Sequence, residues 1–326
     1  MSARLISIIV PVYNEQDSVA QLVREIREIA DRFALDIEVL FVDDGSTDMS
    51  WSIIERLTEQ DSSLGGVRFR RNVGKAAALM AGFSIARGDV VVMMDADLQD
   101  PPEELPRLLD KLDEGYDVVS GWKRKRHDPW HKVYPSRVFN KLISTLTGVH
   151  LHDHVCGLKC LRRHVTADMR LYGELHRFIG VLAGAHGYRV TEIPTSHRPR
   201  TTGESKYGFS RFAKGFVDLI SVLLTTRFRW RPQHLIGVLG AWLIVVCPLL
   251  VFASLFSAVV ARLIGALMVG VAGVVLLALG LIAEMLTAQR PMGDLYDIVE
   301  RVGRCRHRVP KPPLDPAPAF EHDAFS

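Results

Sequence analysis

The chain has 326 residues, of which 48% are hydrophobic, and its formal net charge is only +3. A charge this small gives no argument for nucleic acid as a partner, and four cysteines in so long a chain exclude a disulfide framework. The mean hydropathy of +0.12 is high for a soluble enzyme and low for a protein that crosses a membrane many times, which predicts a soluble part joined to a smaller membrane part.

Strand and helix patterns alternate along the first 205 residues. Short apolar, β-branched runs predict strands, and apolar residues spaced three and four apart predict helices. Strands are expected at residues 6–11, 37–42, 67–69, 89–94, 118–120 and 189–193, and helices at 17–32, 50–60, 74–86, 103–114, 135–147 and 174–187. This alternation predicts an α/β domain over residues 1–205, with an open, mostly parallel sheet covered by helices on both faces.

The chain becomes apolar after this domain. Residues 206–232 alternate apolar patches with Arg and Lys, which is typical of helices that lie in a membrane interface. Residues 235–257 and 263–286 are each long enough to cross a bilayer, so a two-helix transmembrane hairpin is expected within residues 233–288.

The basic residues around this hairpin predict its orientation. Arg227, Arg229 and Arg231 precede it and Arg290 follows it, whereas the turn carries only Arg262. The positive-inside rule then places both ends, and the α/β domain, on the cytoplasmic side of the cell's inner membrane. Residues 289–326 are expected to form a cytoplasmic tail, Pro-rich and disordered at its end.

Polar segments follow four of the predicted strands. They are PVYNE (11–15), DDGSTD (43–48), RRNVGK (70–75) and DADLQD (95–100). Ligands of open parallel sheets bind at the carboxyl ends of the strands, where these four segments meet. The chain has no G-x-G-x-x-G and no G-x-x-x-x-G-K-[ST], which argues against a dehydrogenase and a P-loop ATPase. A different nucleotide site is therefore expected at this edge.

The segment DADLQD carries the strongest chemical signal. Asp95 and Asp97 are placed to address one ion, and Gln99 adds a neutral oxygen. Carboxylates and phosphates are the ligands that Mg²⁺ and Mn²⁺ prefer, which predicts one of these metals with a diphosphate. Asp100, before Pro101, is expected to cap the next helix.

Two other clusters are not interpreted as metal sites. Cys156 and Cys160 have no second cysteine pair, so they are expected to be reduced thiols. His150, His152 and His154 alternate in a loop, which favours surface polarity over metal binding.

The ordered motifs resemble a known family. SIIVPVYNE, VDDGSTD, RNVGKAAALMAGFSIARGD and MDADLQDPPE look like the glycosyltransferase family 2 pattern on a GT-A fold. HRPRTTGESKYGFSRF, followed by the hairpin, is similar to polyprenyl-phosphate glycosyltransferases, which include dolichyl-phosphate mannose synthase and bacterial undecaprenyl-phosphate sugar transferases. The resemblance covers about residues 5–290.

The resemblance implies a donor site. The residues implied to bind the nucleotide sugar are Pro11, Tyr13, Glu15, Asp43 or Asp44 at the base, Arg71, Lys75, Asp95, and Asp153 at the sugar hydroxyls. Asp95, Asp97 and Gln99 would hold the metal, Mg²⁺ or Mn²⁺. The surroundings of Asp153 depart from the family pattern, which weakens its assignment.

The resemblance also implies a site for an acceptor phosphate. The candidates are Lys123, Arg124, Lys125, Arg137, Arg198, Arg200, Ser205 and Lys206. Arginine suits phosphate because its donors form a fixed fork. Arg200 and Lys206, in RTTGESK, match the family motif directly and are expected to be catalytic together with Asp95 and Asp97.

The implied reaction is inverting, metal-dependent transfer of a sugar from a nucleotide sugar, a UDP-sugar rather than GDP-mannose, to a polyprenyl phosphate for cell-envelope glycan or lipid modification. One alternative is a processive polysaccharide synthase, but TTRFRW lacks the Gln of Q-x-x-R-W and two spans leave no channel. Another is a non-catalytic membrane subunit that binds nucleotide sugars. The pattern does not specify the sugar, and it leaves a homo-oligomer open.

Overall fold

The computed structural model describes residues 4–124, 130–198, 218–219, 222, 252, 258–288 and 296–306. The chain divides into two compact units. Met1–Phe209 and Pro291–Ser326 form the first, and Ser210–Arg290 form the second.

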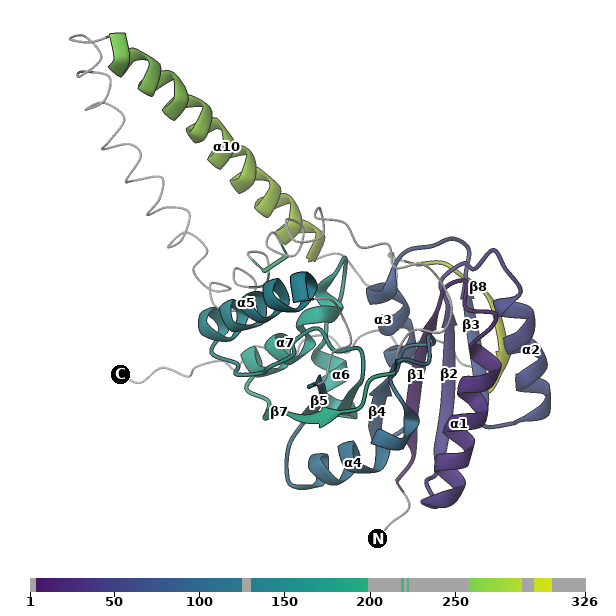
Figure 1. Cartoon of the computed structure of the whole chain (residues 1–326). Coiled ribbons are helices and arrows are strands. Elements are labelled where there is room, and N and C mark those ends of the chain that lie inside the picture. Colours follow the sequence, from purple (N-terminus) through teal and green to yellow (C-terminus); the bar gives the residue numbers. More distant parts are fainter. Residues whose placement is uncertain are drawn as a thin grey trace, which may run out of the picture. The chain divides into compact units, whose positions relative to one another are not determined.

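The first unit is built on one sheet with the strand order β7-β5-β6-β4-β1-β2-β3-β8 (Figure 1). The strands are β1 (Ile6–Val12), β2 (Ile37–Asp43), β3 (Leu64–Phe69), β4 (Val90–Met93), β5 (Val118–Lys123), β6 (Lys159–Arg162), β7 (Val190–Thr195) and β8 (Ile298–Gly303). Neighbours run parallel except at β6 and β8, which are antiparallel to the strands they pair with. The predicted open, mostly parallel sheet of an α/β domain is confirmed.

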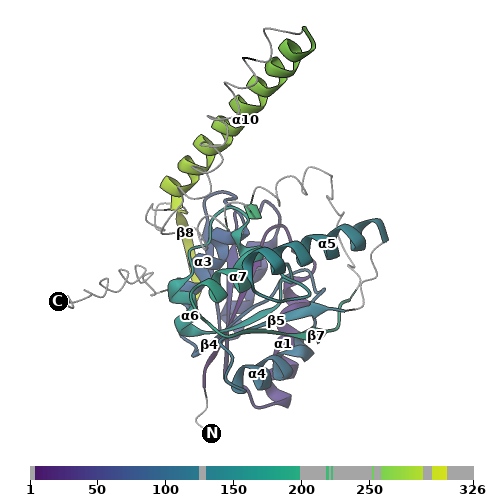
Figure 2. The same ribbon diagram turned by 90° about the vertical axis from the view of Figure 1, so that its left-hand side faces the viewer.

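Helices cover both faces of this sheet. They are α1 (Val19–Arg32), α2 (Ser50–Gln60), α3 (Lys75–Ile85), α4 (Leu105–Asp113), α5 (Trp130–Thr147), α6 (Arg163–Asp168) and α7 (Ile179–Ala185), with 3₁₀ turns η1 (Pro102–Glu104) and η2 (Leu175–Phe178). Figure 2 shows α1 and α4 on one side of the sheet and α6 and α7 on the other. Each amphipathic helix turns its apolar stripe inward, as Leu22, Ile26 and Ile29 do in α1.

Helix α3 is apolar on all sides and lies close to the strands. Residues Ala76 to Phe83 are all buried. A Cβ on Gly82 would lie 2.4 Å from Cγ2 of Ile9 in β1, so only glycine permits this approach. Because α3 begins at Lys75, the packing fixes where that lysine enters the predicted nucleotide edge.

Two strands were not predicted. Strand β6 lies antiparallel between β4 and β5, and its fully buried Lys159 interrupts the apolar pattern by which strands are recognised. Strand β8 lies within residues 289–326, which we predicted to be a tail, and it pairs antiparallel with β3. The Pro-rich segment that we predicted to be disordered lies outside the described residues.

The second unit contains α10 (Ala258–Ala288), a helix of 31 residues that includes the second predicted span. The first predicted span, residues 235–257, lies outside the described residues apart from Phe252. A search limited to the described residues finds no helix that is both long and apolar enough to cross a membrane. The transmembrane hairpin therefore stays a prediction.

Candidate active site

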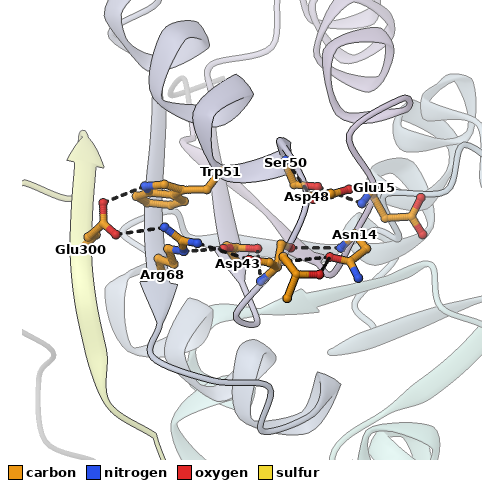
Figure 3. A network of polar contacts seen from close by, with 10 residues as sticks. Asn14, Glu15, Asp43, Asp48, Ser50, Trp51, Arg68 and Glu300 are labelled. Carbon is orange, nitrogen blue, oxygen red and sulfur yellow. Dashed lines mark hydrogen bonds and ion pairs between the residues drawn. The ribbon is translucent and has the colours of Figure 1, made fainter.

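The first two polar loops are joined by hydrogen bonds (Figure 3). The Asn14 backbone N–H donates to the Ser46 hydroxyl over 3.0 Å, and the Asn14 side-chain oxygen accepts from the Thr47 N–H over 2.9 Å. The Glu15 N–H donates to the Ser50 hydroxyl over 2.9 Å. These contacts hold the loop after β1 against the loop after β2, as expected for adjacent parallel strands.

Asp44 joins the second loop to the third. Its two carboxylate oxygens accept hydrogen bonds from the N–H groups of Val73 and Gly74, at 2.7 and 2.9 Å. Burial raises the pKa of Asp44 despite these bonds. Gly45 allows the close approach, because a Cβ there would lie 2.6 Å from the Arg71 carbonyl carbon and its φ is +70°.

Asp43 lies beside Asp44 but has different partners. Its Oδ1 accepts from the Ser46 N–H over 3.2 Å, and its Oδ2 lies 3.2 Å from Nε of Arg68 in β3. Burial raises the pKa of Asp43, since the carboxylate is fully shielded from solvent. Both acids of the pair are thus held in place at the edge, and the structure does not select one of them for the base.

Lys75 joins the third loop to the fourth through an ion pair between its Nζ and Oδ1 of Asp95. The two side chains are 29% and 31% exposed, so a ligand can reach both. All four predicted polar segments are therefore linked along one edge of the sheet.

Asp97 lies in the fourth loop with Asp95, and this pair fits a divalent cation. Burial raises the pKa of Asp97, and the charge of Asp95 adds to the effect. A divalent cation bound by both carboxylates would offset the burial of the Asp97 charge and its repulsion by Asp95. Diphosphate oxygens and water would complete its coordination. Among the described residues, no group of three or more His, Cys, Asp or Glu side chains forms a metal site. The contact of Gln99 with Asp97 is made by its backbone: the Gln99 N–H donates to Oδ1 of Asp97 over 3.2 Å.

Gly157 packs directly against Asp95. A Cβ at this glycine would lie 2.5 Å from Oδ2 of Asp95 and 2.9 Å from its Cγ. Gly157→Ala is therefore expected to push the Asp95 carboxylate aside and lower the activity of this site about 100-fold, because displacements near 1 Å have effects of this size. Initial rates with saturating metal test this, and Gly148→Ala, which meets no atom within 4 Å but has φ +76°, controls for backbone strain. Activity in Gly157→Ala no lower than in this control would contradict the expectation.

Lys159 was not predicted to belong to the site. It is buried in β6, and its ammonium donates to the carbonyls of Cys156 and His154. Burial lowers the pKa of Lys159, and Asp153, Asp95 and Lys75 are close enough to affect it. The residue therefore places a buried amine within electrostatic range of Asp95, and a lone lysine in a strand gives no sequence signal for this.

Asp100 does not cap the following helix as we predicted. The turn η1 has Pro101 at its N-cap and α4 has Glu104. Instead Oδ1 of Asp100 lies 2.9 Å from Nζ of Lys123 in β5. Burial would raise the pKa of Asp100, but His197 and Lys123 outweigh it and hold the pKa at about 2.

The predicted phosphate-binding cations are only partly described. Arg198 forms ion pairs with Glu25 at 2.7 Å and Glu103 at 2.9 Å. Arg124 is exposed, with its guanidinium 5.9 Å from the ring centre of Trp122. Four predicted residues, Lys125, Arg200, Ser205 and Lys206, lie outside the described residues, and so does the side chain of Arg137 in α5.

The remaining nucleotide candidates differ in exposure. Tyr13, directly after β1, is 46% exposed, and Arg71 is also exposed. Pro11 and Glu15, two residues before and after Tyr13, are partly buried. Asp153 is buried, and its N–H donates to Glu192 over 3.2 Å.

The histidine prediction was wrong for one residue. His154 is buried beside Ser144, at 3.0 Å, and burial lowers its pKa to about 4. His152 is exposed, as expected, and stacks on Trp122. Cys156 and Cys160 are buried, and burial raises the pKa of each thiol to about 12.

Comparison with known proteins agrees with this geometry. Two curated relatives are each named undecaprenyl-phosphate 4-deoxy-4-formamido-L-arabinose transferase. The one from Enterobacter sp. (strain 638) is 41% identical over 237 residues, covering 72% of this chain and 71% of the relative. The one from Aeromonas hydrophila subsp. hydrophila is 39% identical over 239 residues, covering 73% and 72%.

Solved structures share the fold. The glucosyl-3-phosphoglycerate synthase of Mycobacterium tuberculosis, in complex with Mn²⁺, UDP-glucose and phosphoglyceric acid, has a TM-score of 0.51 at 21% identity over 68% of this chain and 79% of that one. The mannosyl-3-phosphoglycerate synthase of Rubrobacter xylanophilus has a TM-score of 0.52 at 19% identity over 70% and 76%. The family model described as glycosyl transferase family 2 matches residues 7–170. With a GT-A-like sheet, four linked loops and these relatives, the chain belongs to glycosyltransferase family 2 and is a glycosyltransferase.

Proposed function

We propose that the protein transfers a sugar from a nucleotide-diphosphate sugar to a polyprenyl phosphate, with inversion at the anomeric carbon. The observation that carries this proposal is the continuous set of contacts along the sheet edge, which ends in Lys75, Asp95 and Asp97. The names of the curated relatives, which specify undecaprenyl phosphate and 4-deoxy-4-formamido-L-arabinose, support the acceptor class.

In the proposed donor site, Tyr13 and the Asp43–Asp44 pair bind the nucleoside, and Lys75 turns from Asp95 toward the diphosphate. Asp95 and Asp97 hold Mg²⁺ or Mn²⁺, and Gln99 completes the set. A bound divalent cation supplies positive charge that stabilises the departing nucleoside diphosphate. A solved structure of the same fold contains Mn²⁺ and UDP-glucose, so a UDP-sugar is the first donor class to test.

In the proposed acceptor site, Arg200, Lys206 and Ser205 bind the lipid phosphate. Arg124 and Arg137 contribute further positive charge to the same phosphate. A phosphate monoester has a second pKa near 6 and is largely ionised at neutral pH. It therefore needs positioning rather than a strong general base. Lys123 and Arg198 already pair with carboxylates, so we assign them a structural role.

We also propose that residues 233–288 attach the enzyme to the inner membrane as a hairpin, with the α/β unit in the cytoplasm. The sequence supports this proposal, because residues 263–286 carry Glu284 as their one charged residue and, as a helix at about 1.5 Å per residue, would exceed a hydrocarbon core of about 30 Å. A lipid acceptor makes this attachment useful, because the acceptor phosphate lies at the membrane surface.

Incubation of the purified full-length protein with labelled nucleotide sugars, undecaprenyl phosphate and Mn²⁺ tests the reaction. We include UDP-linked 4-deoxy-4-formamido-L-arabinose, other UDP-sugars and GDP-mannose. A glycolipid with one sugar is expected. No glycolipid with any donor would overturn the proposal, bound donor without transfer would favour a non-catalytic subunit, and long polymer would favour a processive synthase.

Metal removal is expected to abolish this activity. EDTA should stop glycolipid formation, and Mn²⁺ or Mg²⁺ added in excess should restore it, because the Asp95 side chain is 31% exposed and a cation bound there can exchange with the solution. Protons compete with the metal for Asp97, whose pKa is raised by burial, so more Mn²⁺ is expected to be needed for half-maximal rate as the pH falls. Full activity in EDTA would contradict the metal assignment.

A further inference from the structure

Arg68 of β3 contacts three residues, from two segments of the chain, through its three guanidinium nitrogens. Nε lies 3.2 Å from Oδ2 of Asp43, and Nη2 donates to the Ser46 carbonyl over 3.2 Å. Nη1 donates to Oε1 of Glu300 over 3.1 Å. Asp43 is the last residue of β2 and Ser46 lies in the loop that follows it, so this arginine contacts both the end of the strand and its loop.

Glu300 lies in β8 and has two partners. Its Oε1 accepts from Arg68, and its Oε2 accepts from Nε1 of Trp51 in α2 over 2.9 Å. Figure 3 shows the glutamate on β8 facing both side chains, with the Arg68 guanidinium continuing toward Asp43. Trp51 is buried, and the Arg68 guanidinium carbon is 5.9 Å from its ring centre. The indole therefore fixes one carboxylate oxygen while the other holds the arginine.

The register of the sheet places this contact. Arg68 pairs across the ladder with Glu300 of β8 on one side and with Asp43 of β2 on the other. The three residues form one row across three strands, so their side chains meet on the same face. The row ends at the first residue of DDGSTD.

We propose that Glu300 is a positioning residue for the donor nucleotide: it orients Arg68, and through Arg68 it sets Asp43 and the loop that receives the base. The inference rests on the proposed function, because it assumes that this loop binds a nucleotide. Arg68 is 30% exposed and Glu300 44% exposed, so without Glu300 the guanidinium can turn to solvent. The Asp43 carboxylate, fully buried, then loses its cation, and the loop loses its bond at Ser46.

A purely structural role for Glu300, in holding β8 to the sheet, predicts a different result. In that case Glu300→Gln would lower the unfolding temperature but leave the affinity for the nucleotide unchanged. Asp297 provides a matched control, because it forms an ion pair with Arg70 at 2.9 Å between the same two chain segments. The side chains of Arg70 and Asp297 are 70% and 69% exposed, and neither residue belongs to the Asp43–Arg68–Glu300 row. Asp297→Asn removes a charge pair from this edge without touching the row.

The test measures the dissociation constant of UDP in the presence of Mn²⁺, on the full-length protein, by calorimetry. Glu300→Gln is expected to weaken UDP binding about 5-fold, the size of one half-exposed charged contact, and Asp297→Asn by less than about 2-fold. The KM for the donor should rise in parallel, with kcat and the KM for the acceptor unchanged.

A double-mutant cycle distinguishes action through Arg68 from a separate effect. Arg68→Lys alone should weaken UDP binding, because lysine lacks the three-way fork. Glu300→Gln added to Arg68→Lys should then weaken it no further. Thermal unfolding of each variant, followed by tryptophan fluorescence, confirms that the sheet is intact.

Two results would overturn the inference. One is a UDP affinity of Glu300→Gln equal to that of the wild type. The other is a double variant whose loss of UDP affinity equals the product of the losses in Glu300→Gln and Arg68→Lys. Wild-type protein that binds neither UDP nor GDP with Mn²⁺ would instead overturn the proposed function, and the inference with it.

Discussion

Asp97→Ala is expected to lower sugar transfer by about 100- to 1,000-fold or more, the range seen when one group that stabilises transition-state charge is removed. Asp97 and Asp95 are the two carboxylates that we propose for the cation, whereas Asp100, the third acid of this loop, pairs with Lys123. Removal of one leaves a single carboxylate, and the departing diphosphate loses the charge that stabilises it. Initial rates of glycolipid formation over a range of Mn²⁺ concentrations measure the loss.

The fold should survive this substitution. Asp97 is partly exposed, and its raised pKa shows that burial opposes its charged form, so alanine removes no stabilising ion pair. Unfolding at or above the wild-type temperature is therefore expected. Asp110→Ala, at an exposed carboxylate of α4, is the matched control and should transfer sugar at the wild-type rate. Wild-type transfer by Asp97→Ala would overturn the metal assignment.

Lys123→Met is expected to lower the free energy of unfolding by about 3 kcal/mol, because it removes the lysine of a buried ion pair and leaves the Asp100 carboxylate with His197 alone. The Lys123 side chain is 16% exposed and that of Asp100 only 1%, so water screens this pair little. Urea unfolding followed by tryptophan fluorescence measures the change. Lys111→Met, which breaks an exposed pair with Glu114, should leave stability almost unchanged.

A double substitution separates the lost pair from lost packing. Lys123→Met combined with Asp100→Leu removes both charges and should recover most of the stability. Acid should act in the same direction as Lys123→Met. The pKa of Asp100 falls from 3.8 in the unfolded chain to about 2 in the fold, so its stabilisation is present above about pH 4 and is lost as the pH falls toward 2. Wild-type stability in Lys123→Met would contradict this account.

Local patterns in the sequence predicted most of the first unit. The apolar runs of β1, β2 and β4 and the apolar stripe of α1 depend on nearest neighbours along the chain, and such patterns are readable. The convergence of the four polar segments followed from the parallel sheet alone, and the contacts of Asn14, Asp44 and Lys75 now join them.

What could not be predicted depends on partners far along the chain. Asp100 looks like a helix cap beside Pro101, but its ion-pair partner Lys123 comes from the next strand. His154 stands in a polar loop and yet is buried, because α5 supplies Ser144 to it. Strand β8 is short and carries charges, as edge strands do, and its partner β3 precedes it by more than 200 residues.

The pairing of β8 with β3 also constrains the topology of the segment between them. A β-ladder forms only between strands in the same aqueous compartment, so Ile298–Gly303 must lie on the same side of any bilayer as the sheet. If residues 210–290 cross a membrane, as we propose, they must therefore cross it an even number of times. A single crossing within this segment is incompatible with the β3–β8 ladder, and a reporter inserted directly after β8 would report the compartment of the sheet itself.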